Sequence, residues 1–521
     1  MPRQSVMRHQ FGATPRAMIP RSSFDRSHGL KTTFDADELV PILVDDIMPG
    51  DTFNVSVNLF ARLATPIYPI MDNMYLETFF FFVPYRLVWD NWEKFCGAQD
   101  DPNDSIDFTI PIRDTGNTTI GGLYDYMGLP HGVGVGEHNV LPFRAYNLIF
   151  NEWFRSQSLT DSATVNTDDG PDTTTFSIQK RAKRYDYFTA ALPSPQKGTA
   201  VSLPLGTTAP IFADSGVNNQ TVGVLGTITD TVVRALDTDG TAGGDLTLDT
   251  GTIATHQLLA DLSGATAATI NDLRLAFKTQ RLLERDARSG TRYNETILAH
   301  WGVVVPDFRV QRPEFLGGGT SPVNVTPVAQ TTYQGTPTAE DAKGTLAGFG
   351  TVSGRHSFTK SFNEHGVLLG LINARADITY SQGKERYWSK STRYDFMYPI
   401  LADIGEQAIT NGEIYWQDTP ATDDAVWGYI PRYDEYRHKL SRITGAFRHS
   451  ASGTLNAWHL SEEFSSLPTL GNTFIQSNTA APLDNAIAVS TEPHFIADIF
   501  FQMQCARPMP LYGEPGGLGR F

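Results

Sequence analysis

The strongest strand patterns in this sequence lie close to its two ends. Residues 53–59 alternate apolar side chains with Asn and Ser, and residues 495–505 alternate in the same way before two prolines stop the run. This period of two predicts strands with one buried face. Residues 74–83 are almost continuously apolar, which predicts a strand covered on both faces. The sequence therefore favours a mainly β fold: an eight-stranded jelly roll, a β-sandwich or barrel, with long inserted loops and a few short helices.

Three segments have helical signals, and one glycine run does not. Residues 87–96 stop at a glycine, and residues 142–157 begin with a proline, which suits a first helical turn. Residues 271–290 predict the best helix, because an Asn stands at the capping position and a Gly at the end. Residues 317–319 are three glycines without the Lys-Ser or Lys-Thr of a phosphate-binding loop, so they predict a tight turn.

Composition divides the chain into five regions. We expect an extended basic N-terminal arm (1–50), jelly-roll core with helical insertions (51–197), a surface-exposed insertion (198–270), continued core (271–505) and a C-terminal extended arm (506–521). Five prolines spread through the first region exclude long helices there. The insertion is rich in Thr, Gly, Asp and Ala, and alternating pieces at 221–229 and 245–253 predict a small β-rich excursion.

Charge is spread unevenly along the 521 residues. The chain has 41 Lys and Arg against 57 Asp and Glu, a net charge of −16. Residues 1–31 nevertheless hold six cationic side chains and one anionic side chain, whereas residues 198–273 hold one and eight. The overall charge argues against a general nucleic-acid binder, but the cationic regions leave room for an anionic partner on one face.

The composition also predicts contacts between chains. Aromatic residues make up 11% and charged residues only 19%, so the chain buries much apolar surface, in itself or against neighbours. Trp89, Trp92, Tyr146 and Trp153 are candidates for such contacts. No apolar run reaches the roughly 18 residues that span a bilayer, so no membrane insertion is expected. No secretory signal is visible and the two cysteines lack a metal or redox spacing, which favours the cytoplasm.

Four internal cationic groups and the basic arm are candidates for nucleic-acid binding. In residues 274–288, five Lys and Arg recur at i, i+4, i+7, i+11 and i+14 and form one helical stripe. Residues 180–188, 384–394 and 432–442 mix cations with aromatic rings, as single-stranded nucleic acid favours. A solvated helix face or a protein interface explains each group about as well. The candidate residues are Arg3, Arg8, Lys180, Arg181, Lys183, Arg184, Arg274, Lys278, Arg281 and Arg285.

Signals of catalysis are weak. There is no Gly-x-Ser-x-Gly elbow, and no His pair has the helical spacing of a zinc protease. We therefore assign no catalytic, cofactor-binding or metal-binding residue and expect no enzyme. The alternative is a cytoplasmic all-β carbohydrate-active enzyme, whose two cleft carboxylates a sequence does not reveal.

Segments along nearly the whole chain carry a family resemblance. They are residues 24–32, 60–66, 71–74, 78–84, 282–288, 312–319, 359–362, 394–396 and 505–510. In these the chain resembles the major capsid protein of gokushoviruses, the Microviridae subgroup of small icosahedral phages with circular single-stranded DNA. Residues 160–175 and about 200–265 are the main parts outside the resemblance.

The resemblance implies a structural protein of the virion that is assembled in the host cytoplasm. It implies a jelly-roll subunit in a T=1 shell, with the 198–270 insertion as a protrusion near the three-fold axes that meets a host surface receptor. It also implies an internal scaffolding protein and a small basic DNA-binding protein as partners, beside the single-stranded DNA genome.

Overall fold

The structure is a computed structural model that consists of two compact units, residues 1–195 with 305–521, and residues 196–304. It describes residues 20–198, 211–213, 222–225, 233–238, 246–248, 258–260, 270–289, 293–302, 311–331 and 344–512.

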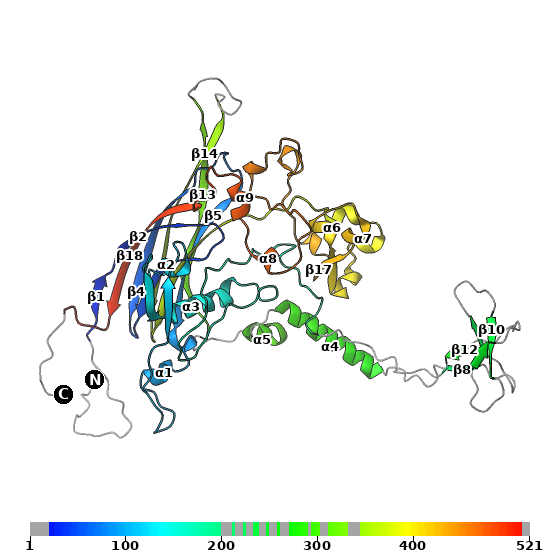
Figure 1. The fold of residues 1–521 in the computed structure, drawn as a ribbon, viewed down its shortest axis with the longest axis horizontal. Helices are drawn as coiled ribbons and strands as arrows, with labels where there is room; N and C mark the ends of the chain where they lie inside the picture. The colour runs from blue at the N-terminus through cyan, green and yellow to red at the C-terminus, as the bar shows by residue number, and fades with distance from the viewer. Residues whose placement is uncertain are drawn as a thin grey trace. The chain divides into compact units, whose positions relative to one another are not determined.

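One antiparallel sheet dominates the larger unit. Among the described residues its nine strands are β1 (Ser22–Asp25), β2 (His28–Phe34), β3 (Val40–Ile47), β4 (Thr52–Leu63), β5 (Met74–Pro84), β13 (Glu314–Ala329), β14 (Leu346–Ser361), β15 (Gly366–Ala376) and β18 (Phe495–Arg507). Their order is β1-β18-β4-β14-β13-β5-β15-β3, and β2 also pairs with β18. The sheet curls on itself (Figure 1). The mainly β, jelly-roll class predicted from the sequence is confirmed, although the strands form one curled sheet of nine where eight were expected.

The strands predicted near the two ends of the chain are direct neighbours. β18 pairs with β4 over twelve positions, from Phe495 opposite Leu63 to Ala506 opposite Thr52. Both strands alternate buried and more exposed side chains, because only one face of each meets the core. The alternation of apolar and polar residues therefore predicted correctly which side chains of β4 and β18 are buried.

The third predicted strand, β5, is covered on both faces, as its apolar run indicated. Phe80 and Phe82 belong to the core inside the curled sheet. Phe81 and Val83 point to the opposite face and pack in a second core that also contains α3 (Leu141–Ile149). Successive side chains of a strand alternate between faces, so a strand between two cores needs apolar residues at every position.

The predicted helices are shorter than expected in the larger unit. Residues 142–157 form α3 followed by a π-helical turn, Phe150–Phe154. Residues 87–96 contain only α1 (Trp92–Phe95), after a 3-10 turn at Tyr85–Leu87. The Asp-Asn pair before α1 explains the break, because these side chains favour caps and turns over helix interiors.

The remaining short elements lie in the connections. They are β6 (Ile112–Asn117) with β7 (Gly134–Asn139), β16 (Glu406–Thr410) with β17 (Val426–Pro431), α2 (Leu123–Tyr126), α6 (Asn411–Ile414), α7 (Pro420–Asp423), α8 (Asn472–Ile475) and α9 (Ala480–Asp484). A third apolar core, which contains Phe188, Trp427 and Phe474, packs near β16 and β17.

The prediction of an extended arm over residues 1–50 is wrong for its described part. Residues 22–47 form β1, β2 and β3, and the first two pair with β18. Pro41 does not prevent this, because β3 is an end strand of the sheet and its register shifts beside Pro41. At the other end of the chain, β18 extends into the predicted C-terminal arm as far as Arg507.

The glycine triplet at 317–319 is not a turn. It lies inside β13, where that strand pairs with β5 after a register shift. A Cβ atom on Gly318 would stand 2.1 Å from the carbonyl oxygen of Thr78, and one on Gly319 would stand 2.2 Å from the ring of His356. At Gly318 the backbone of β5 is too close for any side chain, and at Gly319 the ring of His356 already fills the space.

The smaller unit contains the predicted insertion and more. Its strands are β8 (Ile211–Ala213), β9 (Val222–Leu225), β10 (Val233–Thr238), β11 (Leu246–Leu248) and β12 (Leu258–Ala260), in sheets of order β11-β10-β9 and β12-β8. The short strands expected there are therefore present. The unit also includes α4 (Ile270–Ser289) and α5 (Tyr293–Trp301), which the sequence had assigned to the core.

Candidate nucleic-acid interface

The cationic group at 180–184 is largely an internal structural feature. Arg181 and Arg184 both bind the carboxylate of Glu77 on β5, and Arg375 of the adjacent β15 donates to the same carboxylate. The Arg184 and Arg375 bonds to Glu77 Oε1 are 3.0 and 2.8 Å long. Burial alone would raise the pKa of Glu77, but the hydrogen bond from Arg375 and the charge of Arg181 lower it to about 2.

Lys183 is buried in a second ion pair. Its Nζ lies 2.6 Å from a carboxylate oxygen of Glu462 and 4.4 Å from the ring centroid of Phe474. Together with Arg181, it stabilises the fold from within and is not free to bind a phosphate, so the sequence prediction is corrected for these two residues. Lys180 and Arg184 remain exposed.

A cavity of about 240 Å³ opens beside these pairs, and we call it the arginine cavity. It is lined by residues 181–186, 375–378, Ser441 and Ser477. One of its features favours an anion: Arg375, only 4% exposed, has a buried Nε without a hydrogen-bond partner. Tyr185, next to Arg184, is 80% exposed and offers a ring beside these cations.

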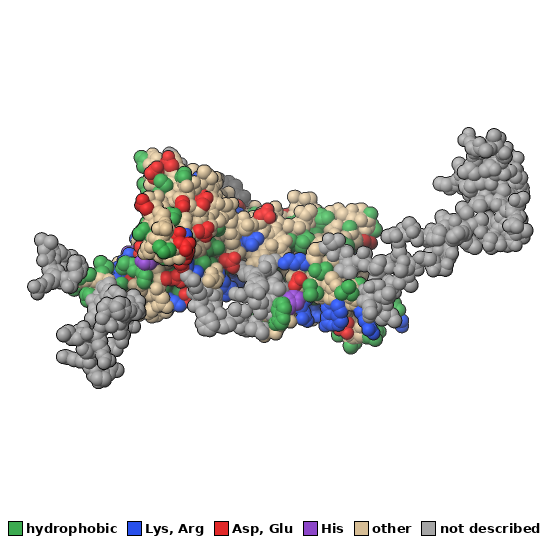
Figure 2. All heavy atoms as spheres, turned by 90° about the horizontal axis from the view of Figure 1, so that it is seen from below, with side chains coloured by type: hydrophobic (Ala, Val, Ile, Leu, Met, Phe, Trp, Pro, Cys, Tyr) green, Lys and Arg blue, Asp and Glu red, His purple; other side chains and the backbone are tan. Residues whose placement is uncertain are grey.

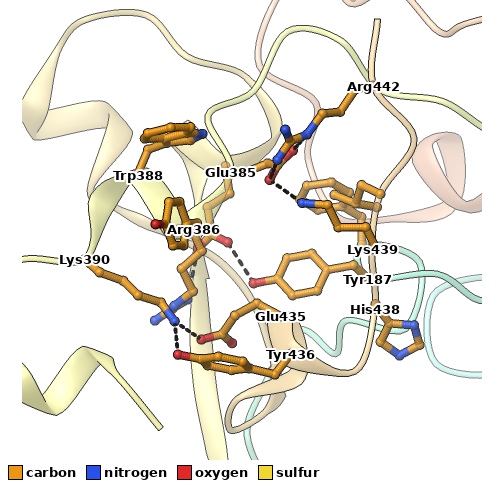
Figure 3. A pocket seen from close by; sticks show the side chains of 14 residues that line it. Tyr187, Glu385, Arg386, Trp388, Lys390, Glu435, Tyr436, His438, Lys439 and Arg442 are labelled. Carbon is orange, nitrogen blue, oxygen red and sulfur yellow. Dashed lines mark hydrogen bonds and ion pairs between the residues drawn. The ribbon is translucent and has the colours of Figure 1, made fainter.

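The cationic-aromatic groups at 384–394 and 432–442 come together around another cavity. This aromatic cavity has a volume of about 380 Å³, and Figure 3 shows Trp388 and Lys390 on one side with Lys439 and Arg442 on the other, while the Tyr436 ring lies against Lys390. The two groups are far apart in sequence, and their convergence was not predicted. Sequence reasoning treated each as a separate weak signal.

Ion pairs hold the cations of the aromatic cavity in place. Lys390 Nζ lies 3.1 Å from Glu435 and 3.0 Å from the Tyr436 hydroxyl, and it stands 4.1 Å from the centroid of the Tyr436 ring. Lys439 and Arg442 both bind Glu385. The hydrogen bond from Arg442 is the main cause of the lowered pKa of Glu385.

The predicted helical stripe is exposed on α4. Arg274, Lys278, Arg281 and Arg285 are all exposed on this helix. The helix α4 also exposes apolar side chains, and Phe277 is 65% exposed. The stripe therefore remains a candidate phosphate-binding row, whereas Arg3 and Arg8 lie outside the described residues.

Sequence reasoning missed Glu77 and Arg375. The available signal was a single carboxylate in the otherwise apolar run of residues 74–83, because a charge in a strand covered on both faces must find a buried partner. Figure 2 shows one face of the molecule, on which Lys and Arg side chains gather in one area.

The aromatic residues proposed for contacts between copies are mostly internal. Trp89 and Tyr146 are 0% and 1% exposed and pack in the second core of the larger unit. Trp153 is 40% exposed, and its indole nitrogen donates to the carbonyl of Pro313. Cys96 and Cys505 are both free thiols. In the described part of the chain, no helix combines the length and apolar content needed to cross a bilayer.

A curled antiparallel jelly-roll sheet with long inserted segments is an architecture that viral shell subunits share with lectins and cupins. The family model described as "Capsid protein (F protein)" matches residues 13–517. Capsid protein VP1 of Bdellovibrio phage phiMH2K is 46% identical, and capsid protein VP1 of Chlamydia phage 1 is 41% identical, each over 98% of both chains. Capsid protein VP1 of Spiroplasma virus 4 is 32% identical over 98% of this chain and 97% of its own. The chain therefore belongs to this family of phage capsid proteins.

Membership of the family confirms the gokushovirus resemblance and the role of major capsid protein. It implies a structural role, assembly of like copies into a shell and a place in the virion. The comparisons give no support to the alternative of a carbohydrate-active enzyme.

Proposed function

We propose that copies of this chain close into a T=1 icosahedral shell around a circular single-stranded DNA genome in the host cytoplasm. Similarity to phage capsid proteins along 98% of the chain carries this proposal. Copies that meet through unlike patches form a closed shell when the rotation between neighbours closes. The partners in this proposal are an internal scaffolding protein, a small basic DNA-binding protein and, through residues 198–270, a host surface receptor.

Exposed apolar side chains on the main sheet support contacts between copies. Phe60 on β4 and Ile496 and Phe500 on β18 are 43%, 62% and 48% exposed. The two strands are neighbours, with Asp498 opposite Phe60. The guanidinium of Arg62 lies 5.6 Å from the centroid of the Phe60 ring. Aromatic and Arg side chains are enriched at protein interfaces, so this face has a suitable composition for a neighbouring copy.

Sedimentation tests the shell. We expect the full chain, expressed with its scaffolding protein, to sediment as particles of megadalton size. A replacement of Phe60 and Phe500 by Ser should leave the subunit folded, because both side chains are exposed, and should lower the particle yield. A wild-type chain that stays monomeric with scaffold present would contradict the proposal.

Deletion tests the receptor role of the insertion. Replacing residues 211–260 by a short Gly-Ser linker should leave the larger unit intact, because these residues belong to the separate smaller unit. We expect particles that assemble with normal yield but adsorb poorly to host cells. Normal adsorption of such particles would exclude the insertion as the attachment site.

A further inference from the structure

We propose that the arginine cavity, the aromatic cavity and a third cavity between them form one track that binds a short stretch of single-stranded DNA. The third, which we call the bridging cavity, has a volume of about 480 Å³ and is lined mainly by residues 380–385 and 440–444. The proposal rests on the proposed function, because it names the place where the shell protein meets the enclosed genome.

The continuity of the track follows from shared walls. Leu440 and Arg442 line both the aromatic and the bridging cavity. Ser441, between them, lines both the bridging and the arginine cavity. The segment 440–442 is therefore a rim common to all three, and a flexible strand that follows this rim passes each cavity in turn.

The track is cationic in an acidic protein. Ten Lys and Arg side chains line the three cavities, against five Asp and Glu side chains. Two further carboxylates, Glu77 and Glu462, do not line the cavities but bind four of the lining cations. When these two are added to the acidic side chains, an excess of three positive charges remains. The whole chain carries −16. This local reversal of sign attracts a polyanion.

The track also offers rings on which bases stack. Tyr387 and Trp388 are 64% and 65% exposed at the aromatic cavity, and Tyr185 is 80% exposed at the arginine cavity. Tyr387 and Trp388 also contact each other, with ring centroids 5.1 Å apart, and clustered exposed apolar side chains mark interaction sites. Rings beside cations are the arrangement that binds single strands, where base stacking is independent of sequence and the cations follow the phosphates.

Two arginines are suited to the phosphates. The Arg184 side chain is 58% exposed although it binds Glu77, so it keeps donors that face solvent. Arg375 lines the arginine cavity, and its buried Nε has no hydrogen-bond partner. A phosphate oxygen in this cavity would accept from both guanidinium groups, which removes the cost of an unpaired buried donor.

DNA fits the track better than a second copy of the chain does. Three lysines besides the buried Lys183 line it, Lys384, Lys390 and Lys439, and lysine is depleted in the cores of protein interfaces. The cavities of 380 and 480 Å³ have the size of small-molecule sites and accept a base, the smaller cavity of 240 Å³ accepts a phosphate, and a flat interface would not need them.

Fluorescence anisotropy with a labelled oligothymidylate and the purified full-length chain tests the track. We expect Trp388→Ala and Tyr387→Ala each to weaken binding roughly tenfold through the loss of one stacking ring. Arg184→Glu should weaken binding by at least as much and lower the slope of the salt dependence by about one ion or more. Tyr512→Ala and Arg355→Glu, at exposed side chains outside the track and outside the other candidate cationic groups, are the matched controls and should bind like wild type.

Particles made from the same variants separate this proposal from the proposed function. Shells that form normally but contain less DNA support the track. Unchanged oligonucleotide affinity of the ring variants overturns the track, while wild-type shells that contain DNA leave the proposed function standing. Variants that bind the oligonucleotide normally but fail to assemble would show an interface between copies, and equal affinity for a duplex would exclude base stacking; both results overturn the track. Melting temperatures equal to wild type confirm that each variant is folded.

Discussion

Glutamine in place of Glu77 is expected to lower the free energy of unfolding by about 3–5 kcal/mol, because it leaves buried arginine charges without a counter-ion. Glu77 binds three guanidinium groups, and the side chains of Arg181 and Arg375 are only 17% and 5% exposed. Urea unfolding of the full chain measures the change. Asp498→Asn is the control, because its pair with Lys31 is exposed and 3.6 Å long, so its loss should cost less than about 1 kcal/mol.

The ion pairs of Glu77 with its three arginines also make the stability of the fold depend on pH. The pKa of Glu77 is lowered from 4.5 to about 2 in the folded chain. A carboxyl with a depressed folded pKa contributes stability that is present above its unfolded pKa, near 4.5, and is lost as the pH falls toward 2. The full contribution is about 3 kcal/mol. Glu77→Gln should therefore differ most from wild type at neutral pH and converge with it below pH 4.5. A difference in unfolding free energy that stays constant from neutral pH to below pH 4.5 would contradict the pairing of Glu77 with the three arginines.

Three strands of the main sheet, β4, β5 and β18, were predictable because the pattern of apolar residues within each one shows which of its faces is buried. β4 and β18 have one buried face and β5 has two, and each pattern is complete within about ten residues. Pairing was not predictable in the same way. β18 pairs with β4 although more than 400 residues of chain separate them, and nothing in the sequence of either segment indicates that the other is its partner.

The errors in the fold have a common physical cause. Residues 22–47 look irregular by themselves, and they become strands because β18 and β15 offer free edges to them. The glycines at 317–319 look like a turn, yet the close approach of Thr78 and His356 is what requires glycine at 318 and 319. In both cases tertiary contacts decide a local conformation that the local sequence leaves open.

The candidate interface was predictable in composition but not in geometry. The groups at 384–394 and 432–442 were identified by their cations and rings, and these do meet around one cavity. The group at 180–184 was identified by the same rule, but two of its members turn inward. The difference lies in Glu77 and Glu462, because distant carboxylates determine which cations are neutralised inside the protein.

Alanine in place of Gly318 is expected to prevent normal folding of the main sheet. The added Cβ would lie 2.1 Å from the carbonyl oxygen of Thr78, a backbone atom of β5 that cannot rotate away. Relief requires β13 and β5 to separate, which breaks their ladder between the two halves of the sheet. We expect a loss of stability above about 4 kcal/mol and little soluble protein.

Gly134→Ala is the matched control for Gly318→Ala. Gly134 also lies in a strand, β7, has no positive φ, and has no atom within 4 Å of the position of an added Cβ. Its replacement should change stability by less than about 0.5 kcal/mol. Soluble yield and the thermal unfolding midpoint of the two variants separate steric overlap from a general cost of replacing strand glycines. If Gly318→Ala unfolds at the wild-type temperature, β13 does not pass as close to β5 as the structure shows, and the curled sheet must be joined differently at its centre.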